Sequence, residues 1–235
     1  MIFAGILAGG SGTRMKKSIP KQFLKISDKP IIIRTLNTFL SIEKIDKVIV
    51  AINTSWYQYC LQLFEEYGID TEKVILTDGG DTRFDSLVNI ALKAKEISNL
   101  NEDILISHDC ARPFVSERII LDNIEKVKYY DAITTSVPTI DTVLISKDGR
   151  TSDDVPIRSN IFLDQGPQTF KVHKFLSIVK ELSSEKKNTY MEIGKLFLDN
   201  KLKVGIVEGD RKNFKVTTEI DLKYSEFLLK EGYVK

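Results

Sequence analysis

Short apolar runs alternate with amphipathic segments through the first half of the chain, and this alternation restricts the fold more than any other feature. The runs at residues 2–7, 47–52, 73–77 and 103–107 predict strands, and the segments at 30–40, 56–67 and 86–97 predict helices between them. Strands joined by helices of this length form a mainly parallel sheet with helices on both faces. We therefore predict an α/β fold with a doubly wound sheet.

The second half of the chain is less regular. Strands are expected at residues 131–137 and 203–207, and a helix at 189–199. A last helix is expected after a cap at Thr217 or Thr218. These elements continue the pattern of the first half, so we expect one domain over residues 1–235.

A projecting arm is expected at about residues 138–163. Two extended stretches flank Lys147-Asp148-Gly149-Arg150, and an Asp-Gly turn between such stretches predicts a hairpin. An isolated hairpin cannot bury its own apolar face. We therefore expect Val143, Leu144 and Ile145 to pack on a second subunit, with the arm serving dimerisation.

The composition restricts the kinds of partner. With 34 basic and 33 acidic side chains the net charge is +1, which argues against a broad nucleic-acid-binding surface. No basic targeting segment precedes the first strand and no apolar stretch is long enough to span a bilayer, so we expect a cytoplasmic protein with no membrane partner. In that setting Cys60 and Cys110 are expected to be unbridged structural residues.

A glycine-rich segment follows the first strand directly. It runs Ala8-Gly9-Gly10-Ser11-Gly12-Thr13-Arg14-Met15, and Pro20-Lys21-Gln22-Phe23 comes soon after it. Glycines let backbone N–H groups approach an anion, and Arg14 and Lys21 add two cations. The spacing fits neither the Walker loop nor the dinucleotide fingerprint. A tight connection would explain the glycines alone, but the two cations favour a phosphate cradle.

Two further polar clusters follow predicted strands. One spans residues 78–86 and the other residues 108–113. Ligands of a doubly wound sheet bind at the carboxyl ends of its strands, so the three strand ends are expected to face one site. Gly79-Gly80-Asp81 has two interpretations: a turn with Asp81 or Thr82 as helix cap, or a surface on which Asp81 and Ser86 recognise a base edge.

His108 and Asp109 are adjacent and point to opposite faces of a strand, so only one is expected to face the ligand. Asp109 is the stronger candidate, because a carboxylate beside substrate phosphates is a suitable ligand for Mg²⁺. His108 is expected to be a partly buried structural residue, and His173 an exposed residue at the start of a helix.

Six motifs occur in a fixed order between residue 2 and about residue 228. They are Ala-Gly-Gly-x-Gly-Thr-Arg-Met, Pro-Lys-Gln-Phe-Leu, Gly-Gly-Asp-x-Arg-x-x-Ser, His-Asp-x-x-Arg-Pro, Gln-x-Pro-Gln-Thr-Phe and Asn-x-Lys-Val-Thr. Together they resemble the cytidylyltransferases of the 2-C-methyl-D-erythritol 4-phosphate and ribitol-5-phosphate group. The resemblance implies a Rossmann-like nucleotidyltransferase fold and a homodimer. It also implies transfer of CMP from CTP to a polyol phosphate with release of pyrophosphate, and Mg²⁺ as cofactor.

The resemblance also assigns residue roles. The catalytic cations would be Arg14, Lys21 and Lys215, and Asp109 would hold the metal. The CTP-binding residues would be Leu7, Ala8, Gly9, Gly10, Ser11, Gly12, Thr13, Gly79, Gly80, Asp81, Arg83, Ser86, Asp109, Ala111 and Arg112. The polyol-phosphate-binding residues would be Thr139, Asp141, Arg158, Thr189 and Thr217, with Arg158 coming from the partner's arm.

The acceptor is expected to be ribitol 5-phosphate, because parts of the chain are more similar to the ribitol-5-phosphate enzymes. These parts are the opening Gly5-Ile6-Leu7-Ala8-Gly9-Gly10 with Thr13, and Phe23. The product, CDP-ribitol, would suit synthesis of a teichoic acid or capsule polymer. The alternative is 2-C-methyl-D-erythritol 4-phosphate. The chain departs from both patterns at Thr189-Tyr190 and at Gly166, which leaves another alditol phosphate open.

Two other classes of protein share part of the pattern. A sugar-1-phosphate nucleotidyltransferase has the same glycine-rich opening but is not expected to have the His-Asp-x-x-Arg-Pro and Asn-x-Lys-Val-Thr segments. A non-catalytic nucleotide-binding module has no need of the cations Lys21 and Lys215 on both sides of a scissile phosphorus.

Overall fold

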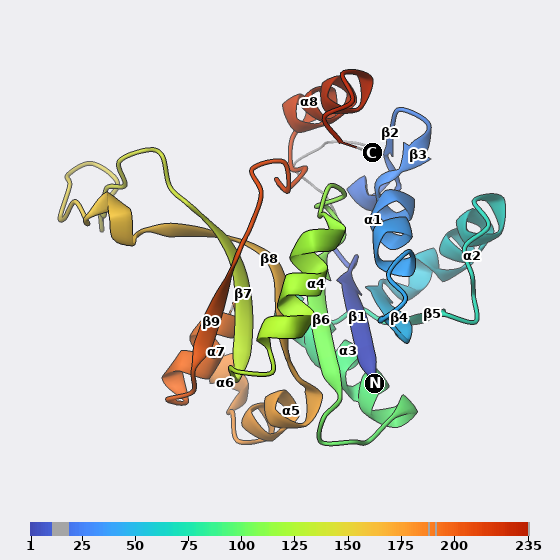
Figure 1. The fold of residues 1–235 in the computed structure, drawn as a ribbon, viewed down its shortest axis with the longest axis horizontal. Coiled ribbons are helices and arrows are strands. Elements are labelled where there is room, and N and C mark those ends of the chain that lie inside the picture. The colour runs from blue at the N-terminus through green and yellow to red at the C-terminus, as the bar shows by residue number, and fades with distance from the viewer. Residues whose placement is uncertain (11–18, 188, 191, 235) are drawn as a thin grey trace.

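The computed structural model describes residues 1–10, 19–187, 189–190 and 192–234 (Figure 1). In this part of the chain a seven-stranded sheet has the strand order β5-β4-β1-β6-β8-β7-β9. Its strands are β1 (Ile2–Leu7), β4 (Lys47–Ile52), β5 (Val74–Asp78), β6 (Ile104–Asp109), β7 (Ala132–Pro138), β8 (Phe162–Lys171) and β9 (Val204–Glu208). A small antiparallel pair is formed by β2 (Lys25–Ile26) and β3 (Lys29–Pro30).

The helices separate the strands along the chain. They are α1 (Ile31–Leu40), α2 (Tyr57–Glu66), α3 (Arg83–Ile97), α4 (Glu117–Lys126), α5 (Val172–Lys180), α6 (Ser184–Lys187), α7 (Ile193–Asp199) and α8 (Glu219–Lys230). Short 3₁₀ turns occur at η2 (Lys21–Phe23), η3 (Thr54–Trp56) and η4 (Arg158–Asn160).

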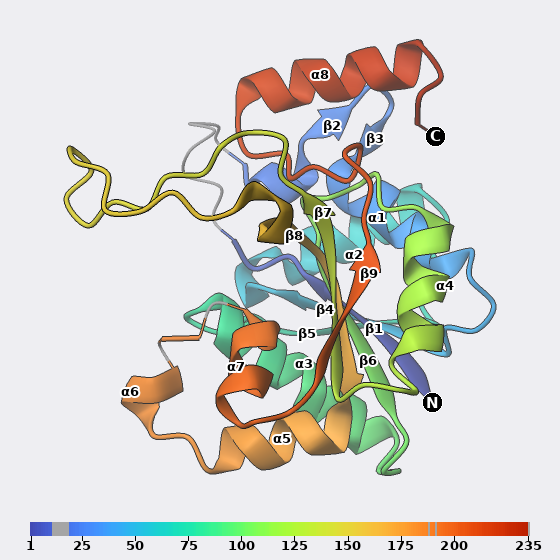
Figure 2. The ribbon, with the colours of Figure 1, turned by 60° about the vertical axis from the view of Figure 1, so that its left-hand side comes forward.

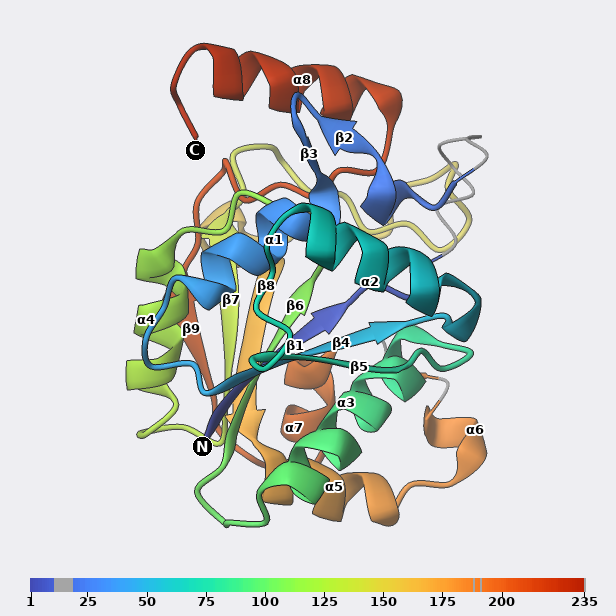
Figure 3. The same cartoon turned by 90° about the vertical axis from the view of Figure 1, so that its right-hand side faces the viewer.

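The sheet is mainly parallel. Strands β5, β4, β1 and β6 run parallel to one another, β9 runs parallel to β7, and β8 pairs antiparallel with both β6 and β7. Helices α1, α2 and α4 cover one face, and α3, α5 and α7 cover the other (Figure 3). The prediction of an α/β, doubly wound, mainly parallel fold is confirmed.

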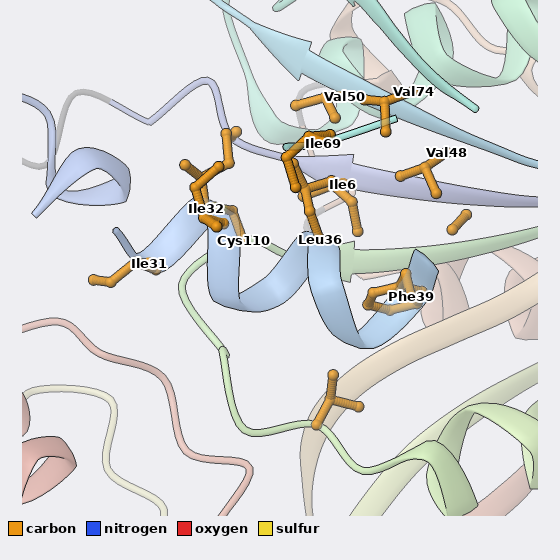
Figure 4. Packing of buried hydrophobic residues seen from close by; sticks show 14 of the residues in the cluster. Ile6, Ile31, Ile32, Leu36, Phe39, Val48, Val50, Ile69, Val74 and Cys110 are labelled. Carbon is orange, nitrogen blue, oxygen red and sulfur yellow. The ribbon is translucent and has the colours of Figure 1, made fainter. Parts of the chain in front are cut away.

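Two apolar layers hold the helices on the sheet. On one face Leu36 and Phe39 of α1 pack against Ile6 of β1 and Val48 of β4 (Figure 4). On the other face Phe3 of β1 belongs to a second cluster with residues of α3, α5 and α7. Successive residues of β1 therefore enter opposite clusters, which is why this strand reads as an almost unbroken apolar run.

The main error of the sequence interpretation is at β8. It expected only a return of the chain to the main body at residues 164–170, whereas the structure has a ten-residue strand there. Gly166 and Pro167 usually indicate a turn, but here they lie where the register shifts against β7, between the pairs Thr134–Gln168 and Ser136–Asp164. A bulge of this kind is one of the few places where a strand accommodates proline. Helix α4 was also missed, the helix start expected at His173 is confirmed by α5, and α7 is shorter than predicted because it begins at Ile193.

The arm leaves the sheet where β7 and β8 separate and projects from the body (Figure 2). Ladder pairing stops at Pro138 and Phe162, and beyond it the described arm residues form one isolated bridge, between Ile145 and Asp154. The prediction of a hairpin with two regular strands is therefore wrong. Its turn is present, since Gly149 has φ +69° and its N–H donates to Ser146 Oγ at 2.9 Å.

Both cysteines are free, as predicted, and both are buried. Across the described ranges, the helices fall short of the length and apolarity needed to cross a membrane.

Candidate functional site

A cavity of about 330 Å³ lies at the carboxyl ends of the strands. It is lined by Leu7, Ala8, Gly9, Gly10, Lys21, Gln22, Gly80, Asp81, Thr82, Arg83, Ser86, Asp109, Cys110, Ala111, Lys215 and Thr217. The ends of β1 and β6 and the turn after β5 thus meet at one cavity, as the sequence predicted. Ser11, Gly12, Thr13 and Arg14 lie outside the described residues.

The start of the glycine-rich segment is fixed by backbone and side-chain hydrogen bonds. Ala8 N–H donates to Ala51 O at 2.9 Å, and the carbonyl of Ala8 accepts from Gln22 Nε2 at 2.7 Å. Gln22 is 4% exposed, so its amide is committed to this contact. The 3₁₀ turn η2 is thereby tied to the end of β1, and its first residue, Lys21, is brought to the cavity.

A second glycine turn packs against the first. Gly80 N–H donates to Ser86 Oγ at 3.0 Å, and that hydroxyl donates to Thr82 O at 3.0 Å. A Cβ atom on Gly80 would lie 2.3 Å from Cβ of Asp85, so only glycine fits there. Thr82 is the helix cap, in a reciprocal capping box with Asp85. Asp81 has no part in this cap and lines the cavity.

Asp109 is the electrostatic centre of the site. Its carboxylate accepts from Lys215 Nζ at 2.6 Å and from Arg83 Nε at 3.1 Å, and Arg112 Nε is 4.0 Å away. Burial alone would favour the neutral acid, but these three cations hold the pKa of Asp109 well below its usual range. The carboxylate is therefore ionised and fixed, and it holds cations at the cavity wall.

The segment after β9 carries the second lysine to the same place. Val216 N–H donates to Ala111 O at 2.8 Å, and Lys21 Nζ donates to Val216 O at 3.2 Å. Lys215 and Asp109 therefore come together although they lie 106 residues apart in sequence. Lys21 and Lys215 therefore both line the cavity, with Lys21 held by the residue that follows Lys215.

The remaining predicted residues divide into two groups. Thr217 lines the cavity, and its hydroxyl donates to Asp221 at 2.8 Å. Gly79, Arg112, Thr139, Asp141, Arg158 and Thr189 do not line it. Gly79 and Arg112 adjoin the lining, Thr139 is buried at the base of the arm, and Asp141 and Arg158 lie on the arm. The hydroxyl of Thr189 donates to Lys186 O at 2.8 Å.

His108 and Cys110 are buried, and burial favours the neutral form of each. His108 is 1% exposed, packs on Phe39 and donates through Nε2 to Arg112 O at 2.9 Å. Burial lowers the pKa of His108 to about 4, so it is neutral at pH 7. Burial also raises the pKa of the Cys110 thiol well above its usual range, so it is not a nucleophile. His173 is exposed, as predicted.

The lining contains three residues that sequence reasoning did not nominate: Gln22, Thr82 and Cys110. Gln22 lies within the Pro-Lys-Gln-Phe motif, and its place beside Lys21 in that motif could have indicated that it belongs to the site. The described residues contain no cluster of three or more carboxylate, histidine or cysteine side chains that could hold a metal ion by themselves. A metal at Asp109 would thus depend on ligands from substrate phosphates, as Mg²⁺ commonly does.

Comparison with known proteins agrees with this arrangement. Residues 2–231 match the profile of the 2-C-methyl-D-erythritol 4-phosphate cytidylyltransferase family. The 4-diphosphocytidyl-2C-methyl-D-erythritol synthase from Anaerococcus prevotii is 26% identical, with a TM-score of 0.80 and coverage of 98% of this chain and 96% of that one. The 2-C-methyl-D-erythritol 4-phosphate cytidylyltransferase from Francisella tularensis is 28% identical, with a TM-score of 0.78 and coverage of 96% and 98%.

The sheet, the strand-end cavity and these similarities define the protein as an enzyme, a nucleotidyltransferase that uses CTP. The chain belongs to the 2-C-methyl-D-erythritol 4-phosphate cytidylyltransferase family. Enzymes of this family bind CTP and a sugar phosphate and generally use divalent metal ions.

Proposed function

We propose that this enzyme transfers CMP from CTP to a polyol phosphate, with 2-C-methyl-D-erythritol 4-phosphate as the first candidate acceptor. The observation that carries the proposal is the convergence of two glycine turns, Lys21 and Lys215 around the Asp109 carboxylate in one cavity. The names of the related enzymes favour methylerythritol phosphate over the acceptor expected from the sequence. Ribitol 5-phosphate remains the second candidate, because the glycine-rich opening and Phe23 favour it.

The proposed reaction needs positioning and charge neutralisation rather than a general base. An oxygen of the acceptor phosphate attacks the α-phosphorus of CTP, the new oxygen–phosphorus bond forms, and the bond to the β-phosphate oxygen breaks to release pyrophosphate. The attacking group is already an anion, so no proton has to be removed. Lys21 and Lys215 would hold the two anions together and neutralise charge on the α-phosphate oxygens.

In the proposed complex Gly9 and Gly10 approach the triphosphate, and Asp81 and Ser86 face the cytosine. Ser86 already holds the turn through its bond to Gly80 N–H, so its expected contribution is to fix that turn. Asp109 is the residue suited to a magnesium ion, which would add positive charge beside the phosphates. Arg14 would contribute from outside the described residues.

We also propose a homodimer formed through the arm. Leu144, Ile145 and Ile157 are 62%, 48% and 71% exposed, and an arm of this length has no apolar core of its own. The second copy would receive Arg158, whose guanidinium otherwise donates to Ile140 O on the same arm at 3.4 Å. In solution the expected mass is twice 26.7 kDa, and Leu144→Asp combined with Ile157→Asp should reduce it to that of one chain.

The direct test is pyrophosphate release with each of the four nucleoside triphosphates. The acceptors are 2-C-methyl-D-erythritol 4-phosphate, ribitol 5-phosphate, glycerol 3-phosphate and glucose 1-phosphate, each with Mg²⁺. Turnover with CTP and one polyol phosphate is expected. Turnover only with glucose 1-phosphate would assign the enzyme to the sugar-1-phosphate class, and no turnover with any pair would refute the proposal.

A further inference from the structure

Two carboxylates beside the cavity share one amide donor. Gln168 Nε2 donates to Asp164 Oδ2 at 2.8 Å and to Glu192 Oε2 at 2.9 Å, while Gln168 Oε1 accepts from Ile193 N–H at 3.3 Å. Gln168 is 1% exposed, so its amide orientation is fixed by these contacts. We call Asp164, Gln168 and Glu192 the carboxylate fork.

The fork is joined to the cavity through Arg83. This guanidinium donates through Nε to Asp109 at 3.1 Å and places Nη1 3.9 Å from Glu192 Oε2. Asp109 and Glu192 therefore lie on two sides of one planar group. The negative charges of Asp109, Asp164 and Glu192 also stabilise the charged form of the neighbouring Arg112, against the effect of its burial. The fork thus lies next to the cations of the cavity.

The fork has capacity for further hydrogen bonds. A carboxylate has about four acceptor positions. Within the described residues the bonds from Gln168, one from Thr134 to Asp164 and one between the two carboxyl groups leave acceptor positions on both Asp164 and Glu192. Glu192 keeps 48% of its side chain exposed, and Asp164 is also exposed. Burial raises the pKa of Glu192, and the charge and hydrogen bonding of Asp164 add to that shift, while the nearby Arg83 opposes it.

A buried hydroxyl without a hydrogen-bond partner lies beside Gln168 of the fork. Ser107 is directly opposite Gln168 in the β6–β8 register and on the same face of β6 as Asp109. It is 1% exposed, and its Oγ has no hydrogen-bond partner among the residues described. Arg112 Nε, which is also buried, has no hydrogen-bond partner there either. Unsatisfied buried polar atoms are uncommon and point to a polar group that joins them when the site is filled.

We infer that the carboxylate fork binds the hydroxyl groups of the acceptor and makes the enzyme selective for a polyhydroxylated phosphate ester. This inference rests on the proposed function. The acceptor phosphate is attracted to the cations at Asp109, and its carbon chain then extends toward Asp164 and Glu192. Ionised carboxylates only accept hydrogen bonds. They therefore favour a substrate that carries hydroxyl donors and disfavour a substrate that carries a carboxylate of its own.

The test measures pyrophosphate release at saturating CTP for Asp164→Asn, Glu192→Gln and the double variant. The acceptors are the preferred polyol phosphate and n-pentyl phosphate, which has no hydroxyl groups. Each single substitution should raise the KM for the polyol phosphate about tenfold or more, because hydrogen bonds to charged groups are strong. The kcat and the KM for CTP should stay within about twofold.

Asp122→Asn is the matched control, because Asp122 is a half-exposed carboxylate on α4, on the opposite face of the sheet, paired with Arg118. The preference of the wild type for the polyol phosphate over n-pentyl phosphate should shrink in the double variant, which a purely structural role would not produce. Wild-type turnover with unchanged KM and unchanged preference in both single variants would overturn the inference alone. No wild-type turnover with any polyol phosphate would overturn the proposed function and the inference together.

Discussion

Gly80 is the cavity residue with the least room for a side chain. An added Cβ would lie 2.3 Å from Cβ of Asp85, 2.8 Å from the carbonyl carbon of Asp85 and 2.9 Å from the nitrogen of Ser86. Carbon atoms that are not bonded prefer separations of about 3.5–4.0 Å. Because two of these neighbours are backbone atoms, Gly80→Ala would push the first turn of α3 away from the turn after β5.

The cost follows from two terms. Overpacking of this kind costs about 1–3 kcal/mol, and the lost hydrogen bond from Gly80 N–H to Ser86 Oγ costs about 1 kcal/mol more. We expect Gly80→Ala to lower the free energy of unfolding by about 2–4 kcal/mol, and to weaken CTP binding because Asp81 moves with the turn.

Urea unfolding followed by circular dichroism measures the first effect, and CTP titration measures the second. Gly9→Ala is the matched control, since its Cβ would meet Ser86 Oγ at an ordinary 3.6 Å and should change stability by less than about 0.5 kcal/mol. If Gly80→Ala is as stable as Gly9→Ala, the steric argument is refuted.

Three further predictions concern other parts of the molecule. Lys21→Ala should lower kcat about 100-fold or more with the fold intact, and near-normal turnover would remove Lys21 from the proposed mechanism. Because His108 has a pKa of about 4 in the folded protein and about 6.5 when unfolded, its contribution to stability is complete above pH 6.5 and is lost as the pH falls toward 4. Unfolding in urea at pH 7 and pH 5 should therefore differ by about 2 kcal/mol from this residue; His108→Gln should remove that difference, and the exposed His173→Gln should keep it. Thr218→Ala should cost about 1 kcal/mol of stability by removing the cap of α8, with steady-state kinetics unchanged.

The sequence predicted the parallel core well because its signal there is local. Strands β1 and β4 were predicted with the residues that the structure has, since each is a short apolar run covered on both faces. At β8 the local signal is misleading, because Gly166 and Pro167 are accommodated by the bulge opposite Thr135. Pairing with two other strands decides that segment, and a single-sequence pattern does not contain that information.

The candidate site shows the same division. The glycine turns could be recognised from the sequence, because a tight turn needs glycine at positions that are close together in the chain. The contact between Lys215 and Asp109, 106 residues apart, depends on the pairing of Val216 with Ala111 and has no local signature. The role of Gln22 also depends on a tertiary contact, its hydrogen bond to the carbonyl of Ala8.

The charge arrangement explains how a cavity rich in cations can form before any substrate binds. Arg83, Arg112 and Lys215 would repel one another if they surrounded an apolar space, but Asp109 neutralises part of their charge and fixes their positions. Groups fixed in advance cost little reorganisation when charge develops on a phosphate. Lys215 is 36% exposed, so it can exchange its carboxylate partner for a phosphate oxygen without the burial of Asp109 being disturbed. Asp109 keeps these cations in place in addition to its proposed part as a ligand for a metal, so Asp109→Asn should impair stability as well as turnover.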